Sequence, residues 1–283
     1  MYDLLILNAT LVNEGHLKQA DVGIKNQRIE TLGSDLSAAP AKQVIDATGL
    51  HLLPGLIDDQ VHFREPGLTH KGDLASESAA AVAGGVTSFL EMPNVNPPTL
   101  SNQALEDKYQ LATGRSYANF GFYLGASNDN LEEIKNLNPQ AACGVKVFMG
   151  ASTGNMLVDN LEILEGIFQH SPILVATHCE DTPLIEANEA AAKEKYGEEV
   201  PFSEHPNIRS AEACYKSSSL AVELAKKHGT GLPILHIPSA HRLDLFTAGP
   251  MQDKQITAEA CVHHLWFNSD DYEQLGAQIK CNP

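Results

Sequence analysis

The sequence predicts an α/β fold, a barrel of alternating strands and helices preceded by a small β domain. From residue 51 onward, short apolar runs alternate with longer helix-like segments, which is typical of repeated βαβ units around a parallel sheet. The first fifty residues instead hold several short β-type runs separated by turn residues, which indicates an antiparallel β unit. We therefore expect a β domain at residues 1–52 and a barrel domain at residues 53–283.

The β domain is expected to form from four apolar runs, at residues 4–7, 10–12, 21–24 and 28–32. In the second domain the apolar runs predict seven strands, at residues 56–62, 86–92, 119–124, 144–149, 173–179, 233–237 and 256–261. Helix-like segments lie between them, at residues 73–83, 101–114, 130–136, 160–170, 182–196 and 210–228.

Alternating strands and helices fit either a doubly wound open sheet or a (β/α)8 TIM-type barrel. The two architectures differ in where functional residues gather, because a barrel uses the carboxyl ends of many strands and an open sheet uses one crevice. Five of the seven predicted strands end on His, Lys, Arg or Asn, always at the same end. This distribution favours the barrel, with seven of its strands in this chain.

Composition narrows the function and the location. The chain has 283 residues, of which 43% are hydrophobic, and a net charge of 19 − 36 = −17, which repels nucleic acids and anionic membranes. The apolar run after Asp3 is too short for a signal peptide, and no stretch approaches the ~20 apolar residues of a membrane helix. Five cysteines without a CxxC pair predict reduced, buried thiols in a cytoplasmic protein. Since the charge disfavours nucleic acids and membranes, we expect the partner to be a small molecule.

Three histidines at the ends of separate strands indicate a metal site. One strand histidine is more often a core residue, but His62, His178 and His236 together are hard to explain that way. Imidazole suits zinc, which in catalytic sites keeps one position open for water. Lys146, at the end of an apolar strand, either reaches solvent or stays buried, and a buried amine can react with carbon dioxide to give an anionic carbamate ligand.

Several segments together resemble dihydroorotases of the amidohydrolase superfamily, from residue 3 to the end of the chain. The matching segments are Leu53-Pro54-Gly55-Leu56-Ile57-Asp58, Val61-His62-Phe63-Arg64-Glu65-Pro66-Gly67, Glu91-Met92-Pro93-Asn94, Val145-Lys146-Val147-Phe148, His178-Cys179-Glu180-Asp181, Leu235-His236-Ile237 and Lys280-Cys281-Asn282-Pro283. The resemblance implies that zinc is held in a barrel by four ligands of this chain: His62, a carboxylated Lys146, His178 and His236.

The resemblance also implies a substrate. The planar guanidinium of Arg64 suits a carboxylate, and Asn94 and Asn282 match family positions that hold the same molecule. The implied reaction is hydrolysis of dihydroorotate and its reversal, the closure of N-carbamoyl-aspartate in pyrimidine biosynthesis. Two alternatives stay open: an allantoinase- or dihydropyrimidinase-type cyclic amidohydrolase, and an inactive homologue that serves as a structural partner. We expect a homodimer. For Arg64, the alternative to substrate binding is a surface ion pair with Glu65.

Two departures from the family pattern change the expected number of zinc ions and the expected place of the catalytic Asp. Gln60 stands where the family has its first metal-binding histidine, and an amide oxygen is a weaker zinc donor than imidazole. We therefore expect one firmly bound zinc and a doubtful second one. The family's catalytic Asp follows an eighth strand, which the residues up to Pro283 do not contain. We accordingly expect the catalytic Asp beyond Pro283, and activity to depend on it.

Overall fold

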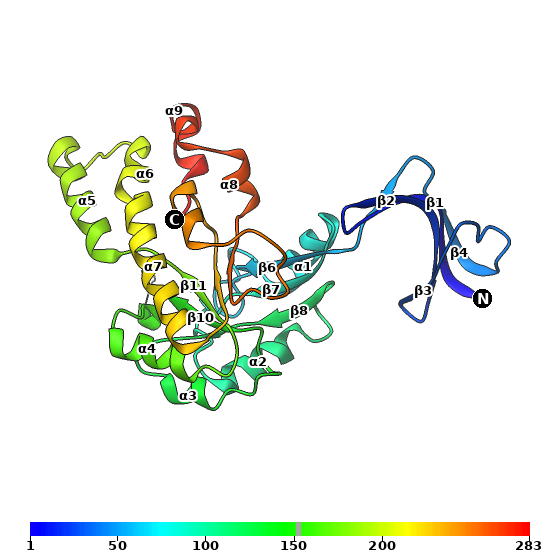
Figure 1. Ribbon diagram of the computed structural model, residues 1–283, viewed down its shortest axis with the longest axis horizontal. Helices are drawn as coiled ribbons and strands as arrows, with labels where there is room; N and C mark the ends of the chain where they lie inside the picture. The colour runs from blue at the N-terminus through cyan, green and yellow to red at the C-terminus, as the bar shows by residue number, and fades with distance from the viewer. Residues whose placement is uncertain (151–153) are drawn as a thin grey trace. The chain divides into compact units, whose positions relative to one another are not determined.

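The first compact unit, Met1–Leu56, is a five-stranded sheet. The computed structural model describes residues 1–150 and 154–283, which form this unit and a second one, Ile57–Pro283 (Figure 1). The strands are β1 (Tyr2–Asn13), β2 (His16–Lys25), β3 (Arg28–Gly33), β4 (Ala41–Asp46) and β5 (His51–Leu52). β1, β2 and β3 pair in antiparallel fashion, as predicted. β4 and β5 were not predicted, and both pair with β1 in parallel.

The second unit is built around parallel strands. These are β6 (Leu56–Val61), β7 (Val86–Glu91), β8 (Asn119–Phe122), β9 (Leu124–Gly125), β10 (Val145–Phe148), β11 (Val175–His178), β12 (Leu232–Ile234) and β13 (Ile256–Ala258). Their order is β6-β7-β8 and then β9-β10-β11-β12-β13, and only Tyr123 separates β8 from β9. Every one of the seven predicted strands is present, with one of them divided in two.

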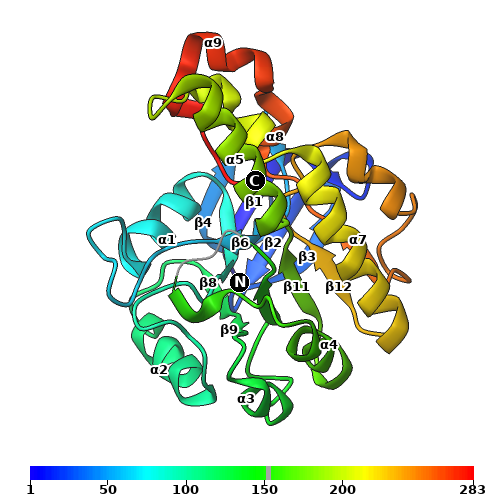
Figure 2. The ribbon, with the colours of Figure 1, turned by 90° about the vertical axis from the view of Figure 1, so that its left-hand side faces the viewer.

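Helices lie around the strands on the outside, as Figure 2 shows for α1, α2, α3, α4 and α7. The helices are α1 (Leu74–Ala83), α2 (Asn102–Ala112), α3 (Leu131–Lys135), α4 (Leu161–His170), α5 (Thr182–Tyr196), α6 (His205–Ile208), α7 (Ala211–His228), α8 (Val262–Trp266) and α9 (Tyr272–Leu275). All six predicted helices are present, and the short α6, α8 and α9 are additional. No helix in the described part of the chain is long and apolar enough to span a membrane.

Side-chain caps explain where the main helices begin. Asp73 accepts hydrogen bonds from Ala75 N and Ser76 N at the start of α1, and Ser210 accepts one from Ala213 N at the start of α7. These caps satisfy amide groups that have no partner inside a helix. At the other end of α7, Gly229 has a φ of 73°, the left-handed conformation that glycine adopts without steric cost.

The core of the second unit lies between the strands and the helices. Phe89, Phe122 and Val175 from the strands are completely buried with Ile167 and Ala225 from the helices. Burying a large apolar side chain contributes roughly 1.5–3 kcal/mol, so this layer supplies most of the unit's stability. The prediction of buried cysteines holds only in part, since Cys179 and Cys214 are buried, Cys143 and Cys261 are half-buried, and Cys281 is exposed.

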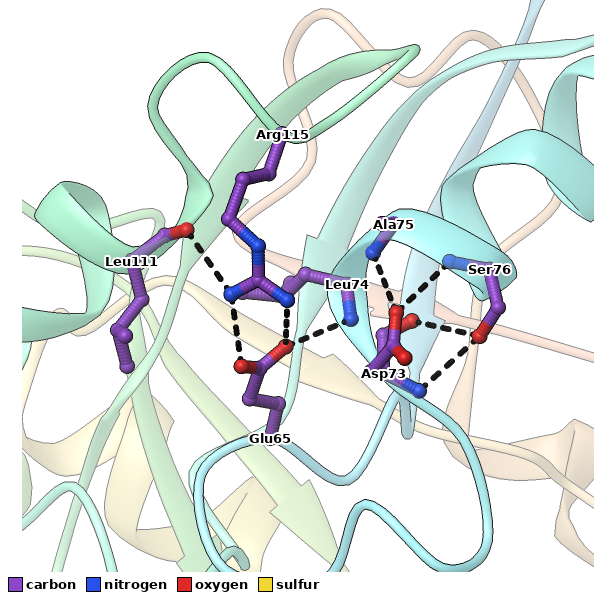
Figure 3. Close-up of polar contacts among 7 residues, drawn as sticks. All are labelled: Glu65, Asp73, Leu74, Ala75, Ser76, Leu111 and Arg115. Carbon is purple, nitrogen blue, oxygen red and sulfur yellow. Dashed lines mark hydrogen bonds and ion pairs between the residues drawn. The ribbon is translucent and has the colours of Figure 1, made fainter.

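The loop after β6 is fixed by an ion pair that the sequence did not predict. Glu65 accepts hydrogen bonds from Arg115 Nη1 at 2.7 Å, Arg115 Nη2 at 3.1 Å and Leu74 N at 2.9 Å (Figure 3). Such a two-pronged arrangement is the strongest form of an arginine–carboxylate contact. Glu65 is therefore bound by Arg115 and not by Arg64, which rules out the surface pair considered for Arg64. The loop is tied to the start of α1 and to the segment after α2.

Replacing Arg115 with Met should destabilise the protein. The Glu65 side chain is 11% exposed and would lose its charged partner, so we expect the free energy of unfolding to fall by about 1–2 kcal/mol. The measurement is urea denaturation of the full-length protein. The matched control is Lys193→Met, which breaks an exposed pair with Glu189 on α5 and should leave stability nearly unchanged. Equal losses in both variants would contradict the stabilising role of the Glu65 pair.

Candidate metal centre

His178 and His236 come together at the carboxyl ends of β11 and β12. Both are buried, and Nδ1 of His178 lies 3.2 Å from Nε2 of His236. Two nitrogens bound to one tetrahedral zinc at about 2.1 Å are about 3.4 Å apart. The spacing of this pair therefore fits two ligands of a single ion.

Glu180 fixes the orientation of the His178 ring. One oxygen of this fully buried carboxylate lies 2.6 Å from His178 Nε2 and 2.6 Å from Arg209 Nη1. Burial alone raises the pKa of Glu180, but the contacts with His178 and Arg209 outweigh it and keep the pKa below its usual range. Since a carboxylate accepts the proton on Nε2, the Nδ1 atom of neutral His178 carries the lone pair and can bind a metal.

Lys146 lies in β10, the strand beside β11, and is completely buried. Within the described residues its Nζ atom has no hydrogen-bond partner, and it sits 4.5 Å from the centre of the Phe148 ring. Burial lowers the pKa of Lys146 to about 7. A large fraction of the amine is thus neutral near pH 7, which is the form that reacts with carbon dioxide. The sequence left open whether Lys146 reaches solvent or stays buried, and the structure shows that it is buried.

His62 is placed differently from the other two histidines. Its Nδ1 lies 2.7 Å from Asn94 Oδ1, and its Nε2 lies 2.8 Å from Gln60 Nε2. An amide oxygen only accepts, so Nδ1 donates to Asn94 and Nε2 accepts from Gln60. Both ring nitrogens are therefore engaged, and in this arrangement His62 presents no lone pair to a metal. The donor types of Lys146, His178 and His236 suit one metal ion, and the contacts of His62 with Asn94 and Gln60 are in keeping with the expectation of a doubtful second one.

A carboxylate that sequence reasoning left without a role lies close to this cluster. Glu259 follows β13, and its Oε1 accepts a hydrogen bond from His236 N at 2.9 Å. Burial, and then the charge of Asp59, raise the pKa of Glu259 to about 7. The only signal in the sequence was its position at a strand end.

The predicted substrate-binding residues fall into two groups. Arg64 follows β6 beside His62, is partly buried, and its guanidinium makes no hydrogen bond or ion pair within the described chain. Asn94 binds His62, as described above. Asn282 lies elsewhere: its Oδ1 is 2.9 Å from His205 Nε2, at a cleft of about 530 Å³ between α6, the start of α7 and the last residues. The structure does not bring Asn282 into contact with Arg64 or Asn94.

Cys261, His263 and His264 also place three potential ligand atoms within 4.8 Å of one another. Their contacts are structural, because Cys261 N donates to His264 Nδ1 at the start of α8. Burial, reinforced by Glu259, raises the pKa of the Cys261 thiol to about 12, which disfavours the thiolate that a metal requires. These contacts organise the segment at the start of α8.

Comparisons with known proteins relate the chain to cyclic amidohydrolases. No family model matches it. The chain is 34% identical to an allantoinase of Deinococcus radiodurans over 99% of its length and 63% of that protein, and 32% identical to an allantoinase of Rubrobacter xylanophilus over 100% and 62%. Its fold matches an L-hydantoinase (dihydropyrimidinase) from Arthrobacter aurescens with a TM-score of 0.92 and 27% identity, over 100% of this chain and 63% of that one. The chain thus spans just under two thirds of the length of these relatives.

These similarities confirm part of what the sequence predicted. The α/β fold of TIM-barrel type is confirmed, and the likeness to cyclic amidohydrolases of the amidohydrolase superfamily extends over the whole chain. The narrower resemblance to dihydroorotases is not confirmed, because these relatives carry names that match the alternative interpretation, allantoinase or hydantoinase.

The burial of His62 predicts that its ring stays neutral in mild acid. Burial, with the nearby charges of Arg64 and Lys146, lowers its pKa from 6.5 to about 3. Between these values the unfolded chain binds more protons than the folded one, so His62 makes the fold less stable as pH falls. We expect NMR of the metal-free protein to show a neutral His62 ring at pH 5, assigned with a His62→Asn variant. A ring that protonates near pH 6 would contradict the arrangement in which His62 is buried and hydrogen-bonded at both ring nitrogens.

Proposed function

We propose that this chain carries the metal centre of a hydrolase that opens the C–N bond of a cyclic amide. The observation that carries the proposal is the pair His178 and His236 at the ends of β11 and β12, with the buried amine of Lys146 in the neighbouring strand β10, where its charge acts on His178. Similarity to allantoinases and hydantoinases along the whole chain supports the same class of reaction. Small cyclic amides, not nucleic acids or membranes, are then the partners.

The residues of the chain have separate roles in the proposed hydrolysis. A zinc ion, when bound, lowers the pKa of a water molecule to about 7 and polarises a carbonyl group. His178, His236 and Lys146 would hold it, and carboxylation would turn Lys146 from a cation into an anionic ligand. Glu180 and Arg209 keep Nδ1 of His178 available. Neighbouring Phe148 and Met149 are buried and limit the access of bulk water to the cluster.

Two substrate classes are supported by different observations. The names of the relatives favour a neutral ring of the hydantoin type, such as allantoin. Arg64 favours a ring that carries a carboxylate, such as dihydroorotate, because a partly buried guanidinium without a partner is a ready anion-binding group. The net charge of −17 repels such an anion, so its attraction would be local.

An inactive structural homologue is the weaker alternative. A wholly buried lysine without a hydrogen-bond partner destabilises a fold, and a protein that only serves as a scaffold gains nothing from it. The homodimer and the cytoplasmic location inferred from the sequence stay predictions.

Arg64→Ala distinguishes the two substrate classes. In the full-length protein we expect kcat/KM for dihydroorotate to fall at least about 100-fold, since the charged contact with the substrate is lost. Hydrolysis of hydantoin and allantoin should change less than about threefold. The measurement is a steady-state assay of all three substrates, with Lys193→Met as a control at a distant surface site. Equal losses for all three would assign Arg64 a general role and favour the hydantoin-type substrate.

Gln60→His tests the number of metal ions. We expect the full-length protein to retain about one zinc per chain after dialysis, because Gln60 occupies Nε2 of His62 with an amide proton. Gln60→His restores a second imidazole and should raise the retained zinc toward two, as measured by elemental analysis. Gln60→Ala is the control and should leave about one. Two zinc ions that survive dialysis of the unmodified protein would contradict this assignment.

A further inference from the structure

Two residues of the candidate site have an unusual backbone conformation. Arg64 has a φ of 73° and His236 a φ of 40°. Within the described residues of the second unit, no other residue except glycine has a positive φ. Side chains other than glycine avoid this region because Cβ crowds the backbone, so the surrounding structure must hold both residues in place.

The same contact holds both backbones. Arg64 N donates to Oε1 of Glu91 at 3.1 Å, and His236 N donates to Oε1 of Glu259 at 2.9 Å. In each case the glutamate belongs to the next strand along the sheet. Glu91 is the last residue of β7, beside β6, and Glu259 directly follows β13, beside β12. One arrangement thus occurs at two separate strand ends, each time at a predicted ligand of metal or substrate.

We propose that Glu91 and Glu259 are positioning residues that hold Arg64 and His236 in the left-handed conformation and thereby fix the direction of their side chains. The roles of the two side chains rest on the proposed function, but the backbone contacts do not. Neither glutamate needs to touch substrate or metal, because each acts through the backbone of its neighbour.

Glu91 is itself held rigidly. Lys108 Nζ lies 2.9 Å from Glu91 Oε2, and both side chains are essentially inaccessible to solvent. Lys108 also donates to Met92 O at 3.1 Å and lies 4.9 Å from the centre of the Phe122 ring. An isolated buried carboxylate would be strongly unfavourable, so Lys108 permits a charged acceptor at this position. The acceptor for Arg64 N is therefore fixed by core packing and not by the loop that it holds.

Glu259 has no lysine within ion-pairing distance among the described residues. Its Oε1 receives His236 N and lies 3.9 Å from Cys261 Sγ, while Lys146 acts on it electrostatically. The bond from His236 N to the Glu259 side chain holds the left-handed turn together with two backbone bonds, from Ile237 N to Glu259 O at 2.8 Å and from Glu259 N to Ile234 O at 3.0 Å. We expect the distance from His236 Nε2 to His178 Nδ1 to depend on the side-chain contact. Loss of that bond should widen the pair of ligands.

The test for Glu91 compares two double variants of the full-length enzyme. Glu91→Gln with Lys108→Met keeps a hydrogen-bond acceptor, and Glu91→Leu with Lys108→Met removes it, while both remove the buried ion pair. We expect the Leu variant to lose at least about tenfold of the preference for dihydroorotate over hydantoin and the Gln variant less than about threefold. Zinc content should be unchanged in both. A purely structural role would lower stability without separating the two substrates.

The test for Glu259 measures metal affinity without any substrate. Glu259→Gln keeps the acceptor for His236 N and Glu259→Leu removes it. We expect the Leu variant to bind zinc at least about tenfold more weakly in competition with a chelator, and the Gln variant to stay within about threefold of the unmodified protein.

Two results would overturn the inference. One is equal behaviour of the Leu and Gln variants at both positions. The other is a crystal structure of the Leu variants in which residues 64 and 236 keep their positive φ. If the unmodified enzyme shows no preference for the carboxylate-bearing substrate and binds no zinc, the proposed function is wrong. In that case the φ values of residues 64 and 236 in the variant structures alone test whether Glu91 and Glu259 hold the two backbones.

Discussion

The second unit depends on one constraint: charged groups buried at the carboxyl ends of parallel strands must find partners inside the protein. Glu91 meets Lys108, and Glu180 meets His178 and Arg209. Leaving either carboxylate unpaired would cost several kcal/mol, so these pairs fix which elements lie next to each other. Two groups in the described chain do not follow this pattern: the amine of Lys146 has no hydrogen-bond partner, and neither has the second carboxylate oxygen of Glu259. We take these two unfavourable groups as support for the proposed function.

The strands and main helices could be predicted because their signals are local. Each parallel strand is a short apolar run between polar residues, and α7 begins at a serine cap and ends at a glycine. The parallel pairing of β4 and β5 with β1 was missed for a physical reason. Which strand pairs with which depends on residues that are distant in sequence, and Tyr2 meets Ala41 across a large part of the first unit.

In the candidate site, too, some residues could be predicted from local sequence and others could not. His178 and His236 could be proposed from the sequence because each stands at the end of an apolar run, and Lys146 because it is a charged residue inside one. Glu180, Glu91 and Glu259 could not be assigned, because their roles are set by partners about 20 to 30 residues away in sequence. Gln60 was recognised as a weak ligand, but the sequence did not show that its amide occupies the ring of His62. Residue type predicts what a side chain is able to bind, whereas the fold decides what it does bind.

The two proposed substrate classes also differ because residue type and overall fold carry different information. Similarity over the whole chain does not by itself distinguish what a ring substrate carries. Recognition of a carboxylate depends on very few side chains, and Arg64 offers a partly buried positive charge. The buried Glu91–Lys108 pair holds the backbone of Arg64 in a conformation that a non-glycine residue rarely adopts. The conformation of Arg64 and the buried pair behind it are the observations behind the proposal of an anionic substrate group, whereas the names of the relatives favour a ring of the hydantoin type.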